Sequence, residues 1–213
     1  MNVAIAGGRG KIALLLSADL LHEGHSVFGL IRNPDQRPDL VAAGVEPVVC
    51  DLEGDDDVAA AVRGADAVVF AAGAGPGSGA ERKRTMDLGG AVKLIDAGKA
   101  EGIGRYLMVS ALGAGDPPAD GGDVFGEYLR AKSEADQALA DSGLDCTIVR
   151  PGMLTNDRPT GKVALGDGVD GGEIPRADVA AVLAASLTAE NTIGKTFGLV
   201  SGERPIEDAL AAL

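Results

Sequence analysis

Short apolar runs alternate with longer amphipathic runs along the chain. Six apolar runs are continuous, rich in Val or Ile and bounded by turn residues, which is typical of parallel strands covered on both faces. They are Val3–Ala6, Val27–Ile31, Pro47–Cys50, Ala67–Phe70, Arg105–Val109 and Cys146–Val149. Helical spacing is expected between them at Ile12–His22, Asp35–Ala43, Asp56–Arg63, Glu81–Ala100 and Gly126–Asp141. Crossovers of this length predict an α/β fold with a doubly wound parallel sheet and right-handed connections.

The rest of the chain is expected to continue the same domain. After the sixth run we expect a strand at Lys162–Leu165, a helix at Arg176–Leu187, a strand at Thr196–Leu199 and a helix from Pro205. No linker or repeat divides residues 1–213, which therefore form one predicted domain with a short substrate-side region at about 151–213. Ligands bind at the carboxyl edge of such sheets. The loops expected to wall a substrate pocket there are Ala74–Gly79, Leu112–Gly126 and Met153–Pro159.

A glycine turn joins the first predicted strand to the first predicted helix. Gly7 permits a tight turn, Gly10 lets the backbone approach a phosphate, and Ala13 is small enough for the helix to pack on the strand. The positive end of the helix then faces the phosphates of a dinucleotide. The alternative is an ordinary glycine turn in a chain with 32 glycines. The strand before it and the helix after it favour the dinucleotide site.

Composition excludes several classes of function. The net charge of −13 argues against a nucleic-acid partner and against an anionic membrane surface. No apolar stretch approaches the roughly 20 residues of a membrane span, and no basic leader precedes the first strand. The two cysteines, Cys50 and Cys146, are expected to be buried thiols in a reducing cytoplasm. His22 and His25 are more typical of the C-terminal end of a helix than of a metal site, so we expect no metal.

The end of the second predicted strand bears on the choice of cofactor. NAD sites usually place an acidic residue here to bind the ribose 2′-hydroxyl, whereas this chain has Arg32. A guanidinium group can pair with the 2′-phosphate of NADP, and Arg9 can reach the same phosphate from the other side. The alternative is a solvated arginine that ends a strand. Two arginines beside one predicted pocket favour NADP over NAD.

The third predicted strand ends at Asp51 and Leu52. Asp51 can bond the adenine amino group while Leu52 packs on the ring. The equally acceptable alternative is that Asp51 caps the following turn.

Tyr128 and Lys132 lie four residues apart and share one face of a predicted helix. The ammonium group is expected to lower the pKa of the phenol and to bond the nicotinamide ribose, so that the tyrosine can donate a proton to a carbonyl as hydride arrives. Ser110 ends the fifth strand and can orient that carbonyl. The alternative is an ordinary amphipathic helix with a packed tyrosine and a solvated lysine.

Five segments together carry a family resemblance, namely Gly7–Ile12, Val109–Ala111, Tyr128–Lys132, Thr147–Gly152 and Ile174–Ala180. They resemble the atypical short-chain dehydrogenases/reductases, in particular the NAD(P)H-binding or NmrA-like group near the biliverdin and flavin reductases. The resemblance covers essentially the whole chain. It implies a single-domain Rossmann fold, a nicotinamide dinucleotide and a deep cofactor groove.

Site residues follow from this resemblance position by position. The matching cofactor positions are Gly7, Arg9, Gly10, Lys11, Ile12, Arg32, Asp51, Leu52, Ala71, Ala72, Gly73, Lys132, Pro151, Gly152 and Met153. Ser110 and Tyr128 match catalytic positions of the wider superfamily. Many members of the subgroup keep the lysine and vary the tyrosine, and some act as redox sensors, so Tyr128 favours catalysis.

Two classes of function are therefore expected. The first is an NADP-dependent reductase of a small carbonyl, quinone or flavin-like acceptor. The alternative is a non-catalytic protein that senses the NADPH/NADP ratio, and a smaller possibility is isomerase or epimerase chemistry with bound cofactor. A cavity between Tyr128 and the nicotinamide supports turnover, whereas a side chain that fills it supports sensing. The sequence specifies neither the small-molecule substrate nor the oligomeric state.

Overall fold

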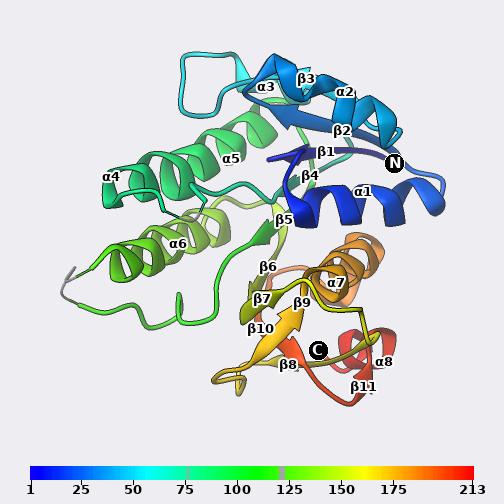
Figure 1. Ribbon diagram of the computed structural model, residues 1–213, viewed down its shortest axis with the longest axis vertical. Helices are drawn as coiled ribbons and strands as arrows, with labels where there is room; N and C mark the ends of the chain where they lie inside the picture. Colours follow the sequence, from blue (N-terminus) through cyan, green and yellow to red (C-terminus); the bar gives the residue numbers. More distant parts are fainter. Residues whose placement is uncertain (76, 120–122) are drawn as a thin grey trace.

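The computed structural model describes residues 1–75, 77–119 and 123–213, which are built around one sheet of nine strands (Figure 1). Seven neighbouring strands run parallel. In spatial order they are β3 (Glu46–Val49), β2 (Ser26–Ile31), β1 (Asn2–Ala6), β4 (Ala67–Phe70), β5 (Arg105–Val109), β6 (Asp145–Pro151) and β10 (Lys195–Ser201). This order confirms the predicted doubly wound Rossmann sheet.

The chain changes winding direction between β1 and β4, the strands at the middle of the parallel part. Connections after β1 lead to β2 and β3 on one side, and those after β4 lead to β5, β6 and β10 on the other. A crevice therefore opens at the carboxyl ends of β1 and β4, where open α/β sheets bind their ligands.

Helices cover both faces of the sheet (Figure 1). One layer is made of α1 (Lys11–His22), α7 (Arg176–Thr188) and α8 (Ile206–Ala211), with α1 packed on α7. The opposite layer is made of α3 (Val58–Val62), α4 (Ala80–Arg82), the π-helix η2 (Lys83–Gly90), α5 (Ala91–Ala100) and α6 (Val124–Ala140). The remaining helical segments are η1 (Pro34–Gln36), α2 (Arg37–Ala42) and η3 (Glu190–Thr192).

Strand alternation divides the hydrophobic core into two clusters. Successive side chains of a strand point to opposite faces, so Val3 and Ile5 of β1 join the cluster under α1 and α7, while Ala4 and Ala6 join the cluster under α5 and α6. This two-sided burial explains why the strands appear in the sequence as continuous apolar runs.

The structure departs from the predicted elements in three places. The strand predicted at Lys162–Leu165 is present as β8 (Lys162–Gly166), but it runs antiparallel to β10, and the short strand β11 (Arg204–Pro205) pairs antiparallel with β8. The short strands β7 (Met153–Thr155) and β9 (Glu173–Pro175) pair in a separate small sheet. The helix predicted at Glu81–Ala100 begins as α4 and contains the π-helix η2 before it becomes α5.

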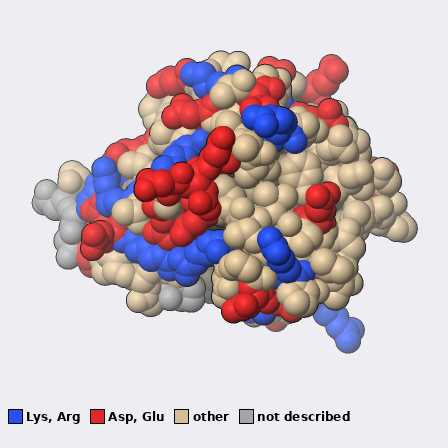
Figure 2. Space-filling model, turned by 90° about the horizontal axis from the view of Figure 1, so that it is seen from above, with Lys and Arg blue, Asp and Glu red and all other residues tan. Residues whose placement is uncertain are grey.

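Charged side chains of both signs are mixed on the surface. On the face drawn in Figure 2, Lys and Arg are interspersed with Asp and Glu among the described residues. Ion pairs such as Arg84 with Glu134 and Arg63 with Glu101 agree with this mixing. No helix in the described part of the chain is long and apolar enough to cross a membrane.

Candidate cofactor site and active site

The surrounding backbone leaves no room for a side chain at two positions of the loop between β1 and α1. Gly7 has a φ of +78°, and a Cβ atom on it would lie 2.8 Å from the Cα atom of Ala72. A Cβ atom on Gly8 would lie 2.6 Å from the Cα atom of Gly29 in β2. The chain therefore uses glycine here to bring three backbone segments together.

The same loop fits a dinucleotide phosphate. Gly10 is the N-cap residue of α1, its N–H donates to the carbonyl oxygen of Gly7 at 2.7 Å, and no side chain caps the helix. The first turn of α1 carries no acidic residue. The unpaired N–H groups and the positive end of the helix are thus left for an anion, as the pyrophosphate of NAD(P) requires.

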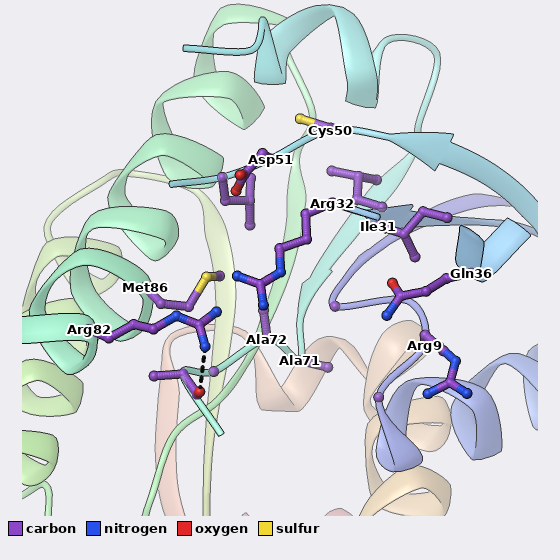
Figure 3. Close-up of a pocket in the computed structure, with 16 residues that line it drawn as sticks. Arg9, Ile31, Arg32, Gln36, Cys50, Asp51, Ala71, Ala72, Arg82 and Met86 are labelled. Atoms are coloured by element: carbon purple, nitrogen blue, oxygen red, sulfur yellow. Dashed lines mark hydrogen bonds between the residues drawn. The ribbon is translucent and has the colours of Figure 1, made fainter. Parts of the chain in front are cut away.

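A cavity of about 340 Å³ lies beside this loop (Figure 3). Its walls come from the ends of β1, β2, β3 and β4 and from the start of the α4–η2 helix. It brings together the predicted residues Gly7, Arg9, Gly10, Arg32, Asp51, Leu52, Ala71, Ala72 and Gly73. The sequence analysis missed Gln36, Arg82 and Met86, which line the same cavity. We call this space the first cavity.

The two arginines predicted to flank one phosphate have different partners. Arg9 pairs with Asp39, and Figure 3 shows it apart from Arg32. Arg32 reaches across the first cavity and lies 3.4 Å from an oxygen of Glu53. Both arginines line the first cavity, but Asp39 engages the guanidinium group of Arg9, whereas Arg32 contacts Glu53.

Asp51 satisfies the capping alternative and also lines the first cavity. Its Oδ1 accepts a hydrogen bond from the N–H of Glu53 at 2.9 Å, which closes the turn after β3. Leu52 is buried beside it. The adenine contact of Asp51 remains a prediction.

A second cavity of about 560 Å³ adjoins the first. Both are lined by Ala71–Ala74, so together they form one groove along the carboxyl edge of the sheet. The second cavity brings together Ile12, Ser110, Tyr128 and Lys132 from segments that are far apart in the sequence. The predicted candidate catalytic residues therefore share one space.

Four predicted cofactor positions lie outside the lining of both cavities. Lys11 donates from Nζ to Oδ1 of Asn156 at 3.3 Å. Pro151, Gly152 and Met153, which join the end of β6 to the start of β7, line neither space. The next residue, Leu154 of β7, lines the second cavity instead. A Cβ atom on Gly152 would lie 2.3 Å from the carbonyl oxygen of Gly172, so this segment packs closely against the loop before β9.

Lys132 is almost fully buried and does not act on Tyr128 as the sequence suggested. Its Nζ donates to the carbonyl oxygen of Val109 at 3.1 Å and lies 3.3 Å from Oδ1 of Asp87. Burial raises the pKa of Tyr128 above its ordinary value, and the nearby carboxylates of Asp87 and Asp136 raise it further. The predicted lowering of this pKa was wrong, because burial of the phenol is the largest effect on it and the carboxylates of Asp87 and Asp136 add to that effect.

Ser110 belongs to a buried polar group that the sequence analysis missed. Its hydroxyl donates to Oδ2 of Asp136 at 2.8 Å, and Nε of Arg150 donates to the same oxygen at 2.8 Å. Asp136 is 3% exposed and follows Lys132 by four residues on the same face of α6. Tyr128, Lys132 and Asp136 follow one another at intervals of four residues, and this spacing could have indicated from the sequence that Asp136 shares their helix face.

The α4–η2 helix forms the wall between the two cavities. Arg82 and Met86 line the first cavity, whereas Lys83 and Asp87 line the second. The two residues of each pair are four positions apart and so share a helix face. One face of this helix therefore borders the first cavity, and the neighbouring face borders the second. In the described part of the chain, no group of three His, Cys, Asp or Glu side chains could hold a metal ion.

Comparison with known proteins gives the family. Residues 7–190 match the sequence profile of the family described as NAD(P)H-binding. The chain belongs to this NAD(P)H-binding family. It is an atypical short-chain dehydrogenase/reductase, as its motifs indicated, and its fold is that of the oxidoreductases and epimerases of this type.

Relatives of this NAD(P)H-binding protein carry different activity names. A Bacillus subtilis protein named as an uncharacterized sugar epimerase, YhfK, is 40% identical over the full length of both chains. A Bacillus halodurans structure provisionally named an NAD-dependent epimerase/dehydratase covers 100% of both chains with 41% identity and a TM-score of 0.92. ChuY, an anaerobilin reductase from Escherichia coli O157:H7, has 27% identity and a TM-score of 0.81, with 95% of this chain and 98% of that chain covered.

Proposed function

We propose that this NAD(P)H-binding protein is an NADP-dependent oxidoreductase that reduces a small carbonyl, quinone or flavin-like acceptor. The observation that carries the proposal is the second cavity, which is about 560 Å³ and bordered by Ser110, Tyr128 and Lys132. It adjoins the first cavity, so a dinucleotide in the groove would present its nicotinamide end there. An open space at this point favours turnover over a purely sensing role.

The first cavity supports the assignment of NADP. Its lining includes Arg32, which is 55% exposed and holds a single contact with Glu53. A charge-assisted pair with a 2′-phosphate contributes on the order of 1.5–3 kcal/mol. NADH lacks this phosphate, so the pair would favour NADPH by about tenfold or more.

In this proposal, each polar residue of the second cavity has a separate role in the reduction. Bound NADPH would supply the hydride. Tyr128 would donate the proton that completes the reduction, and its raised pKa keeps the phenol protonated at neutral pH. Ser110 would orient the acceptor oxygen, and Lys132 would bond the nicotinamide ribose from its buried position between Val109 and Asp87.

The test is NADPH oxidation against a panel of small carbonyls, quinones and flavins, with NADPH affinity measured separately. Tyr128→Phe is expected to reduce turnover by about 10²–10⁴, because it removes a general acid, while NADPH affinity stays nearly unchanged. Tyr106→Phe is the matched control, since Tyr106 is fully buried in the core and lines neither cavity.

Two outcomes would contradict this proposal. An active wild type whose Tyr128→Phe variant works at full speed would remove the tyrosine from the mechanism and leave water as the proton source. Tight NADPH binding, without oxidation by any acceptor but with a conformational response, would establish the alternative of a redox sensor.

A further inference from the structure

Arg82 places a guanidinium group in the wall of the first cavity, although no sequence motif pointed to it. It is the last residue of α4, its side chain is 35% exposed, and Met86 lines the same wall four residues later. Figure 3 shows Arg82 and Met86 on the side of the cavity opposite Arg9 and Gln36. They therefore border the part of the cavity nearest Asp51 and Ala72.

The hydrogen-bonding edges of Arg82 are largely engaged by the protein. Nε and Nη2 donate to Oε2 of Glu53 at 3.1 and 3.0 Å, and Nη1 donates to the carbonyl oxygen of Ala74 at 3.0 Å. Three of the five N–H groups of the guanidinium are thus in use. The side chain is 35% exposed and lines the first cavity, so the group borders the space that a ligand would occupy.

Glu53, which accepts the hydrogen bonds of Arg82, is itself held in place by a second residue. The hydroxyl of Thr85 donates to Oε1 of Glu53 at 2.7 Å, while Arg82 takes Oε2. Burial alone would raise the pKa of Glu53, but the hydrogen bonds from Arg82 and Thr85, together with the charges of Arg82 and Arg32, outweigh it and lower that pKa below its ordinary value. Glu53 therefore stays charged at neutral pH and fixes the plane of Arg82.

Arg32 presents the opposite arrangement. It is 55% exposed, and within the described residues its side chain has one polar contact, with Glu53 at 3.4 Å, which leaves N–H groups to pair with a phosphate. A guanidinium with engaged edges and a free face is suited to stacking on a flat ring, since arginine planes stack on nucleobases.

We propose that Arg82 is an adenine-binding residue whose planar face stacks on the adenine ring, with Glu53 as its positioning residue. The proposal rests on the proposed function, which places the adenosine half of the cofactor in the first cavity. Adenine is common to NADPH and NADH, whereas only NADPH carries the 2′-phosphate. Arg82 therefore contributes affinity for both cofactors, and Arg32 contributes the preference between them.

The experiment is a titration of the wild type and variants with NADPH and with NADH, followed by the fluorescence of the reduced nicotinamide. Arg82→Ala is expected to weaken both cofactors by the same factor, about 3- to 30-fold, and to leave their ratio unchanged. Arg32→Ala is expected to weaken NADPH alone. Arg84→Ala is the matched control, because Arg84 lies on the same helix, pairs with Glu134 and lines neither cavity.

Two further measurements separate stacking from charge and from general disruption. Arg82→Lys keeps the positive charge but lacks the planar face, so it is expected to bind as weakly as Arg82→Ala. Reduced nicotinamide mononucleotide lacks the adenosine half, and its affinity is expected to be the same for the wild type and Arg82→Ala.

Several results would overturn the inference. Arg82→Ala could leave both affinities intact, change the NADPH/NADH ratio, or weaken the mononucleotide to the same extent. Full recovery of binding in Arg82→Lys would show that charge alone matters. These are binding results, so a wild type that binds NADPH but reduces no acceptor would contradict the proposed reductase without touching this inference.

Discussion

Asp136 illustrates, at the scale of one residue, how burial can outweigh favourable contacts. Its carboxyl group accepts hydrogen bonds from Ser110 and Arg150, yet it is 3% exposed and its Oδ1 has no hydrogen-bond partner within the described residues. Burial raises its pKa from the ordinary 3.8, and the opposing effects of Ser110, Arg150 and Lys132 do not cancel that rise. Charge at this site therefore costs folding free energy.

The stability of the protein should depend on pH through Asp136. Between the ordinary value of 3.8 and the higher folded pKa, the folded state holds a proton that the unfolded chain has released. The free energy of unfolding therefore falls as pH rises through this window. Asp136→Asn does not titrate, so its stability relative to the wild type is expected to increase as pH rises from about 4 to neutral.

Urea unfolding at a series of pH values measures this difference. Asp141→Asn, at the exposed C-cap of the same helix, is the control. A difference between wild type and Asp136→Asn that is constant over the series, or that shrinks as pH rises, would contradict the prediction.

At the scale of elements, the contact between η2 and α6 includes a buried ion pair. The Nζ atom of Lys132 and Oδ1 of Asp87 are 3.3 Å apart, and the two side chains are 4% and 1% exposed. Asp87 also accepts a hydrogen bond from the N–H of Ala74 at 3.2 Å, so it ties the π-helix to the loop after β4. Such π segments are frequent at functional sites.

Breaking this pair from one side should be costly. Asp87→Ala leaves the Lys132 ammonium buried without its carboxylate and is expected to lower the free energy of unfolding by about 3–5 kcal/mol. The double variant Asp87→Leu/Lys132→Met buries no charge and should recover most of that loss. Glu134→Ala, which removes an exposed partner of Arg84, is the control and should change stability by about 0–1 kcal/mol. Urea unfolding measures the free energy of unfolding of all three variants. Equal losses in Asp87→Ala and Glu134→Ala would contradict the role assigned to burial.

The loop between β1 and α1 gives a second prediction at this scale. Gly8→Ala would place a Cβ atom 2.6 Å from the Cα atom of Gly29, a backbone contact that no side-chain rotation relieves. We expect a loss of about 1–3 kcal/mol in unfolding free energy, as in other overpacked sites. Gly104→Ala is the control, because a Cβ atom there meets nothing within 4 Å. A Gly8→Ala protein as stable as the Gly104→Ala protein would show that β2 can move away freely.

At the scale of the whole molecule, α1 and α7 connect the two ends of the chain. They pack on each other across one face of the sheet, and both bury their apolar side chains in the same core cluster. The cofactor loop at the start of α1 and the substrate-side region are therefore expected to unfold in a single transition.

Cofactor binding should raise the temperature of that transition. At an NADPH concentration about 100 times its Kd, binding adds about 2.7 kcal/mol to the free energy of unfolding. For a chain of this size the midpoint should rise by about 5–10 °C. Differential scanning calorimetry measures both the number of unfolding transitions and the midpoint temperature. Two separate transitions would contradict the first expectation, and a midpoint unchanged by NADPH would contradict the second.

The periodic features of the chain were predictable from sequence. The six parallel strands, the glycine loop and the shared helix face of Tyr128 and Lys132 follow from local patterns, because burial on two faces and helical spacing leave their signature within a few residues. The strands β7 and β9 were missed, since elements of three residues are too short to show a period.

Contacts between distant segments were decided only by the tertiary structure. Asp87 precedes Lys132 by 45 positions in the chain, Glu53 precedes Arg82 by 29, and Asp39 follows Arg9 by 30. The sequence indicated a nucleotide-binding fold and named several of the residues that line the groove. It could not say that burial, with Asp87 and Asp136 nearby, would leave the phenol with a raised pKa, because the environment of a buried group depends on every element packed around it.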